Sequence, residues 1–147
     1  MNIEIKRINP VYEELYAIEL LRHQVFHLKT NDTSIKTSYY IFHAMNNRLV
    51  PFGLTIDKKL VAGIYVSCIH DTLFIDSLFV HEDYQKSELK IGKKLLGTIL
   101  ELKPVFEEYF KKDITLSKLA ATSSAKEFYE KIGYQKDEKS PYMIKTI

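Results

Sequence analysis

Three apolar segments follow one another in the middle of the chain, and they constrain its fold more than any other feature. They are rich in β-branched and aromatic residues and comprise residues 52–56, 60–69 and 73–80. Only two short polar turns, at residues 57–59 and 70–71, separate them. Strands joined by turns this short lie antiparallel, so the sequence predicts a three-stranded meander at the centre of the fold.

Segments with helical spacing of apolar residues flank this meander. Helices are expected over residues 11–25, 35–49, 87–106 and 123–132, and further strands over residues 3–8, 114–120 and within 134–147. Asn9-Pro10 and Ser87 are the predicted starts of the first and third helices, and Gly133 is the predicted end of the last. Pro104 is expected to kink or restart the long helix. The order indicates an α/β chain with an antiparallel meander.

The composition excludes several classes of protein. A length of 147 residues, 46% of them hydrophobic, fits one globular domain spanning residues 1–147. A net charge of +2 argues against nucleic acid or an anionic membrane as the main partner. The only cysteine, Cys68, allows neither an intramolecular disulfide nor a multi-cysteine zinc site. No signal-peptide or membrane-spanning apolar run is present, so we expect a cytoplasmic protein.

Three segments carry a resemblance to a known family. They are Leu73–Val80 with the following His81–Gln85, then Ile91–Leu96, and finally Ser124–Tyr134. In this order they resemble the fourth strand, the helix after the pyrophosphate loop and the short late helix of the GNAT superfamily of N-acetyltransferases. The resemblance implies a mixed, mostly antiparallel central sheet with helices on both faces. It also implies direct acetyl transfer from acetyl-CoA to a primary amine, without a metal.

The expected coenzyme site departs from the family at two points. The loop Gln85–Gly92 is about two residues longer than usual and keeps a single glycine, and Thr122 stands where members often have asparagine. Four lysines, at positions 86, 90, 93 and 94, accompany one acid here. They suit the phosphates of coenzyme A at a helix N-terminus, although a solvated helix face is the alternative reading. The coenzyme contacts implied are Leu78, Phe79, Val80, Gln85, Lys86, Ser87, Lys90, Ile91, Gly92, Lys93, Thr122 and Tyr129.

The resemblance also implies catalytic residues. It points to Tyr129 as the acid that protonates the departing thiolate, with a core aromatic residue as the alternative. Asp76 is the candidate base, acting through a water; alternation would place it on one face with Leu78 and Val80. Its alternative is a structural hydrogen bond, and Glu82 is a weaker candidate base. Possible substrate contacts are Arg22, Tyr39, Tyr40 and His43.

Other candidate sites and functions have less support. His23 and His27 are four residues apart and could share a metal, but no third ligand is evident. Cys68 is expected to be a small buried residue and not a nucleophile. The altered loop leaves open a non-catalytic acyl-CoA sensor or a protein-interaction module. The amine acceptor, which could be a small amine or a peptide amine, stays unidentified, and a homodimer is common for the resembled fold.

Overall fold

A computed structural model describes the chain from residue 1 to residue 147. It contains one seven-stranded sheet, ordered β1-β2-β3-β4-β5-β7-β6. The strands are β1 (Ile3–Arg7), β2 (Val50–Ile56), β3 (Lys59–Ile69), β4 (Thr72–Val80), β5 (Leu116–Leu119), β6 (Gln135–Lys136) and β7 (Met143–Thr146). Every neighbouring pair is antiparallel except β4 and β5, which run parallel. The predicted meander and the mixed, mostly antiparallel sheet are both confirmed.

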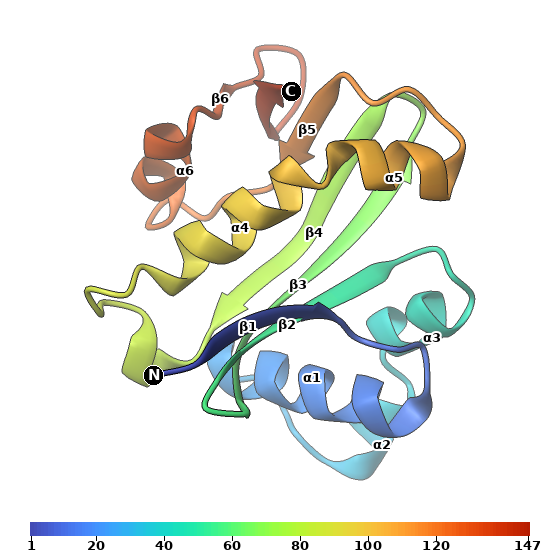
Figure 1. The fold of residues 1–147 in the computed structure, drawn as a ribbon, viewed down its shortest axis with the longest axis vertical. Coiled ribbons are helices and arrows are strands. Elements are labelled where there is room, and N and C mark those ends of the chain that lie inside the picture. Colours follow the sequence, from blue (N-terminus) through green and yellow to red (C-terminus); the bar gives the residue numbers. More distant parts are fainter.

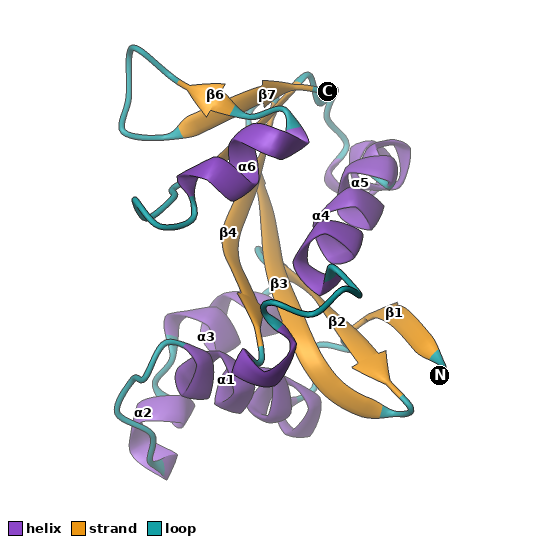
Figure 2. Cartoon of the chain, turned by 90° about the vertical axis from the view of Figure 1, so that its left-hand side faces the viewer, coloured by secondary structure: helices purple, strands orange, loops and turns teal.

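Helices cover both faces of this sheet, as Figure 1 and Figure 2 show. They are α1 (Tyr12–Val25), α2 (Asp32–Lys36), α3 (Tyr39–Met45), α4 (Ile91–Glu101), α5 (Lys103–Phe110) and α6 (Lys126–Ile132), with a short 3-10 helix, η1, at Glu82–Tyr84. Apolar residues of α1–α3 form one core with Tyr65 and Phe79. Those of α4–α6 form a larger core with the alternate residues of β2–β4. No helix is long and apolar enough to span a bilayer.

The two predicted N-terminal helices differ from the observed ones. Helix α1 begins at Tyr12 and not at Asn9-Pro10, because Val11 keeps an extended backbone and no side chain caps the helix. The single helix expected over residues 35–49 is two short helices, interrupted at Thr37 and Ser38. Ser38 is extended, and its hydroxyl accepts a hydrogen bond from the Tyr40 N–H, which starts α3.

The C-terminal half also corrects some predicted boundaries. Ser87 does not cap the long helix: its hydroxyl donates to the carbonyl of Tyr84, and α4 starts only at Ile91. The restart at Pro104 is confirmed, because the helix breaks at Leu102 and Pro104 lies in the first turn of α5. Gly133 ends α6 with a φ of 109°, as predicted for a glycine cap.

Two irregularities of β4 position the site. Tyr65 and Val66 of β3 pair with Ser77 and Ile75, so Asp76 is an extra residue in a β-bulge. In addition, β5 pairs with β4 only as far as the Ile75–Leu119 pair. Beyond this point β4 continues without a neighbour on that side, and the sheet opens between β4 and β5 (Figure 1).

Candidate active site

The Asp76 carboxylate lies at the point where β4 leaves β5. Its Oδ1 accepts a hydrogen bond of 2.6 Å from the Ser67 hydroxyl on β3. Burial raises the pKa of this carboxyl, although the Ser67 bond acts in the opposite direction. The expectation that Asp76 shares a face with Leu78 and Val80 is wrong. The bulge turns the carboxylate to the side of Ser67, whereas those two residues pack toward the opposite core.

Backbone groups of β4 face the open side of the sheet beyond Asp76. The His81 N–H donates to the Val61 carbonyl, which continues the β3–β4 ladder. Alternation along the ladder then directs Phe79 toward β3, and Leu78 and Val80 toward the opening. The Val80 carbonyl agrees with this assignment, because the Gln85 side-chain amide reaches it from outside the sheet at 2.9 Å. Leu78 and Val80 therefore present hydrogen-bonding groups to whatever occupies the opening.

The N-terminus of α4 lies at the wide end of this opening. The N–H groups of Ile91, Gly92 and Lys93 have no acceptor within the helix, and no side chain caps them. Lys90 turns the chain with a φ of 50°, a left-handed conformation that favours glycine. A Cβ atom on Gly92 would lie 3.3 Å from the Phe128 ring and 3.6 Å from Val80, which places α4, α6 and β4 together here.

The lysines of this segment are free of ion pairs. Residues 86, 90, 93 and 94 are all exposed, and none lies within 4.0 Å of an acidic group. The unpaired positive charge adds to the positive end of the α4 dipole. A helix terminus with this charge, beside the opening between β4 and β5, is of the kind that suits an anion.

Tyr129 of α6 is the nearly buried aromatic residue on the other side of the opening. Its hydroxyl makes no hydrogen bond within the chain, although it is not fully enclosed. Burial raises the pKa of Tyr129 to about 12, so the hydroxyl stays protonated at neutral pH. Its neighbour Tyr134 is different: that hydroxyl shares a 2.7 Å hydrogen bond with Ser117 of β5. Thr122 lies in the exposed turn before α6, where its carbonyl accepts two backbone hydrogen bonds.

A buried ionic network below the bulge was missed by the sequence analysis. Glu19 of α1 is completely buried and accepts hydrogen bonds from Arg22, Ser38 and Tyr65, with His23 at 3.2 Å. Burial alone would raise the pKa of Glu19, but these hydrogen bonds outweigh it and lower the pKa. A glutamate four residues after a buried leucine, Leu15, was the available signal, because that spacing places it on the apolar face.

The four residues offered as substrate contacts fall into two groups. Arg22 lies over the ring of Tyr40 at 4.2 Å, and the Tyr40 hydroxyl donates to the Asp76 carbonyl at 3.4 Å. Tyr40 therefore contacts the backbone of the bulge directly, and Arg22 contacts it through the Tyr40 ring. Tyr39 and His43 instead line a pocket of about 440 Å³ that also includes Asp76.

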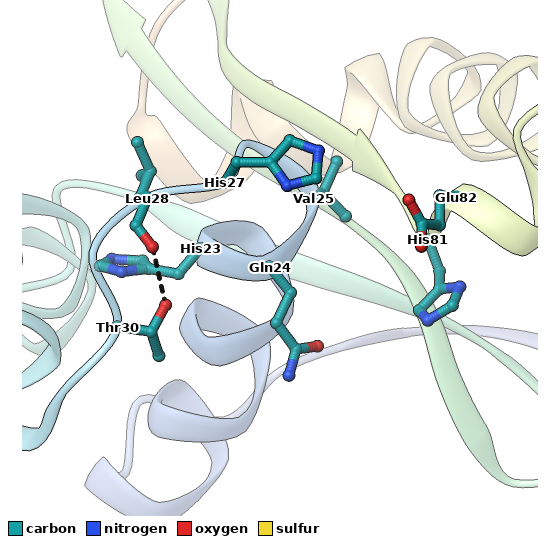
Figure 3. A pocket seen from close by; sticks show the side chains of 8 residues that line it. All are labelled: His23, Gln24, Val25, His27, Leu28, Thr30, His81 and Glu82. Atoms are coloured by element: carbon teal, nitrogen blue, oxygen red, sulfur yellow. Dashed lines mark hydrogen bonds between the residues drawn. The ribbon is translucent and has the colours of Figure 1, made fainter.

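A second pocket, of about 530 Å³, lies between the end of α1 and the residues that follow β4 (Figure 3). His23, His27, His81 and Glu82 are among its lining residues. The helical spacing expected for His23 and His27 is not observed, because α1 ends at Val25 and His27 has a φ of 54°. The His23 ring also contacts Glu19 and the Lys29 carbonyl. No group of three or more His, Cys, Asp or Glu residues is close enough to hold a metal ion.

Comparisons with known proteins agree with this geometry. No curated protein matches the chain significantly. Among solved structures, the PaiA N-acetyltransferase of Thermoplasma acidophilum in complex with coenzyme A aligns with a TM-score of 0.66 and 22% identity, covering 100% of both chains. ElaA of Escherichia coli aligns with a TM-score of 0.70 and 18% identity, covering 98% of this chain and 99% of its own.

A third structure, an acetyltransferase of the GNAT family from Staphylococcus aureus Mu50, has a TM-score of 0.67 at 18% identity and 99% coverage of each chain. At these identities the structures establish the fold. The family follows from a sequence model described as "Acetyltransferase (GNAT) domain", which matches residues 47–136. That match spans more than half of the chain and includes β2–β4 and the α4 terminus. The chain therefore belongs to the GNAT acetyltransferase family.

Proposed function

We propose that this chain is an N-acetyltransferase that transfers the acetyl group of acetyl-CoA directly to a primary amine. The observation that carries the proposal is the opening between β4 and β5, which starts at the Asp76 bulge and ends at the uncapped N-terminus of α4. An extended ligand with a reactive group at one end and phosphates at the other fits this arrangement. The coenzyme A complex of the Thermoplasma relative supports the assignment.

The proposed coenzyme contacts are divided along the opening. The N–H groups of Ile91, Gly92 and Lys93 bind phosphate oxygens at the α4 terminus. The side chains proposed to assist at this terminus come from the preceding loop and the first turn of α4: Gln85, Lys86, Ser87, Lys90 and Lys93. Backbone groups of Leu78 and Val80 pair with the amide-bearing arm, and Thr122 and Tyr129 close the other side. Phe79 contributes little directly, because its backbone faces β3 and its side chain is buried.

The proposed chemistry uses Asp76 and Tyr129 on the two sides of the reacting carbonyl. The amine must lose a proton before it attacks, and Asp76 accepts that proton through a water. Its raised pKa makes Asp76 a stronger base than an ordinary aspartate. As the C–N bond forms and the C–S bond breaks, a β4 backbone N–H stabilises the oxyanion. The Tyr129 hydroxyl gives its proton to the departing sulfur and regains one from solvent, to which Asp76 releases the proton taken from the amine.

Calorimetric titration with acetyl-CoA tests the coenzyme site. We expect a Kd of about micromolar order and much weaker binding of ATP. The double substitution Lys90→Gln and Lys93→Gln is expected to weaken binding about tenfold and to reduce its salt dependence, because two cations near the phosphates are lost. The double substitution Lys29→Gln and Lys36→Gln, before and at the end of α2 on the other face of the sheet (Figure 2), removes the same number of charges and is expected to change nothing.

The outcomes also separate the alternatives. Absence of binding up to millimolar acetyl-CoA would contradict the coenzyme site and favour an interaction module. Binding without amine-dependent release of the coenzyme thiol would favour an acyl-CoA sensor. A cytoplasmic location and a homodimer stay predictions.

A further inference from the structure

The pocket next to Asp76 has an unusual distribution of charge. Its walls come from α3, the end of β3, the middle of β4 and the end of α5. Leu49, Ile69 and Phe110 supply an apolar lining. Arg48 and Lys112, which follow α3 and α5 in the sequence, are the two full positive charges of the lining, and Asp76 is its one acidic residue.

The two cations have no partners in the protein. Arg48 and Lys112 are both exposed, and neither makes an ion pair or a side-chain hydrogen bond. The nearby acid Asp71 is already held by hydrogen bonds from Thr72 and Thr115. Arg22, by contrast, is fully engaged with Glu19. A guanidinium and an ammonium at one pocket suit a carboxylate or phosphate group of a ligand.

Asp76 offers the complementary group to an amine. Only its Oδ1 is occupied within the chain, by the Ser67 hydroxyl, and Oδ2 makes no internal hydrogen bond. The same residue is the first of β4 beyond the last pair with β5. A ligand amine bound at Asp76 therefore lies beside the opening where the acetyl group is proposed to sit.

We propose that the acceptor is a small amine that also carries an acidic group, bound with its amine at Asp76 and its acid at Arg48 and Lys112. This inference rests on the proposed acetyl transfer. The apolar wall between the two charged ends accommodates the carbon skeleton that joins amine and acid. Carboxylates and phosphates share the required charge, so the experiment distinguishes them.

The test compares pairs of amines that differ only in the acidic group. 4-Aminobutanoate is measured against propylamine for the carboxylate, and phosphoethanolamine against ethanolamine for the phosphate. We expect kcat/KM to be at least about tenfold higher for the acid-bearing member of one pair. In the Arg48→Gln, Lys112→Gln double variant this preference disappears through a higher KM for the acidic amine, while KM for acetyl-CoA is unchanged. The Lys58→Gln, Lys59→Gln double variant, at the other end of β3 from the pocket, is the charge-matched control and keeps the preference.

Equal efficiency within both pairs, or a preference that survives in the double variant, would overturn the proposal. A failure of the proposed function is separate, because then no amine releases the coenzyme thiol. In that case calorimetric titration of the same pairs into the CoA-saturated protein decides the question. Binding of an acidic amine that the double variant loses supports the pocket assignment, and absence of such binding contradicts it.

Discussion

The substitution Tyr129→Phe is expected to lower kcat by one or more orders of magnitude and to leave the affinity for acetyl-CoA nearly unchanged. It removes only the hydroxyl, which makes no hydrogen bond within the chain, so the fold loses little. With a pKa of about 12, this hydroxyl is a persistent donor toward a sulfur whose thiol pKa is roughly 8.5. Its main contribution is therefore made while the thiolate leaves. Steady-state kinetics and calorimetry on the same preparations measure both quantities.

Tyr134→Phe is the matched control for this experiment. It removes the same hydroxyl from a ring whose centroid is 6.0 Å from that of Tyr129, but there the hydroxyl bonds to Ser117. We expect that variant to lose about 1 kcal/mol of stability and to keep turnover within a few-fold. Unchanged turnover in Tyr129→Phe would remove this residue from the mechanism. An equal loss in both variants would show a packing effect and not a catalytic one.

The substitution Glu19→Leu is expected to lower the free energy of unfolding by about 3–5 kcal/mol, because it leaves the Arg22 guanidinium in the interior without its carboxylate. It also removes the acceptor of the buried Ser38 and Tyr65 hydroxyls. For a chain of this length such a loss corresponds to a Tm lower by roughly 10 °C. Chemical denaturation and thermal melting measure the effect.

A control variant and the pH dependence of unfolding identify the origin of this loss of stability. Glu14→Gln, exposed on the same helix, is expected to change stability by less than about 0.5 kcal/mol. Because folding lowers the pKa of Glu19, its carboxylate stabilises the fold at neutral pH, and this contribution is lost as the pH falls below about 4. The difference in free energy of unfolding between the native protein and Glu19→Leu should therefore become smaller in acid. A difference in free energy of unfolding that is small at neutral pH, or that does not change with pH, would contradict stabilisation by the Glu19 carboxylate.

The sequence was most informative where local rules agree with the fold. The alternating apolar segments gave β2–β4 within two residues, and the glycine at position 133 gave the end of α6. Helix starts were less predictable. Ser87 has the right residue type for a cap, but its hydroxyl bonds to Tyr84 and the loop runs on to Lys90. Cap residues are compatible with several turns, and tertiary contacts choose among them.

In the candidate site, too, tertiary contacts decide what the local sequence pattern does not. Strict alternation placed Asp76 with Leu78 and Val80, and one inserted residue was enough to reverse that face. A bulge depends on pairing with β3, which no local pattern in β4 records. The charged pocket was equally hidden, because Arg48 and Lys112 are 64 positions apart and line one pocket only once the chain has folded.

The most direct test of the account follows the acetyl group itself. The protein is incubated with isotopically labelled acetyl-CoA and a mixture of primary amines, and mass spectrometry detects the products while free thiol is measured in parallel. We predict one labelled amide for each thiol released, with a much lower yield in Tyr129→Phe. Thiol released without a labelled amide would indicate thioester hydrolysis. That result, or bound acetyl-CoA with no thiol release at all, would contradict transfer to an amine.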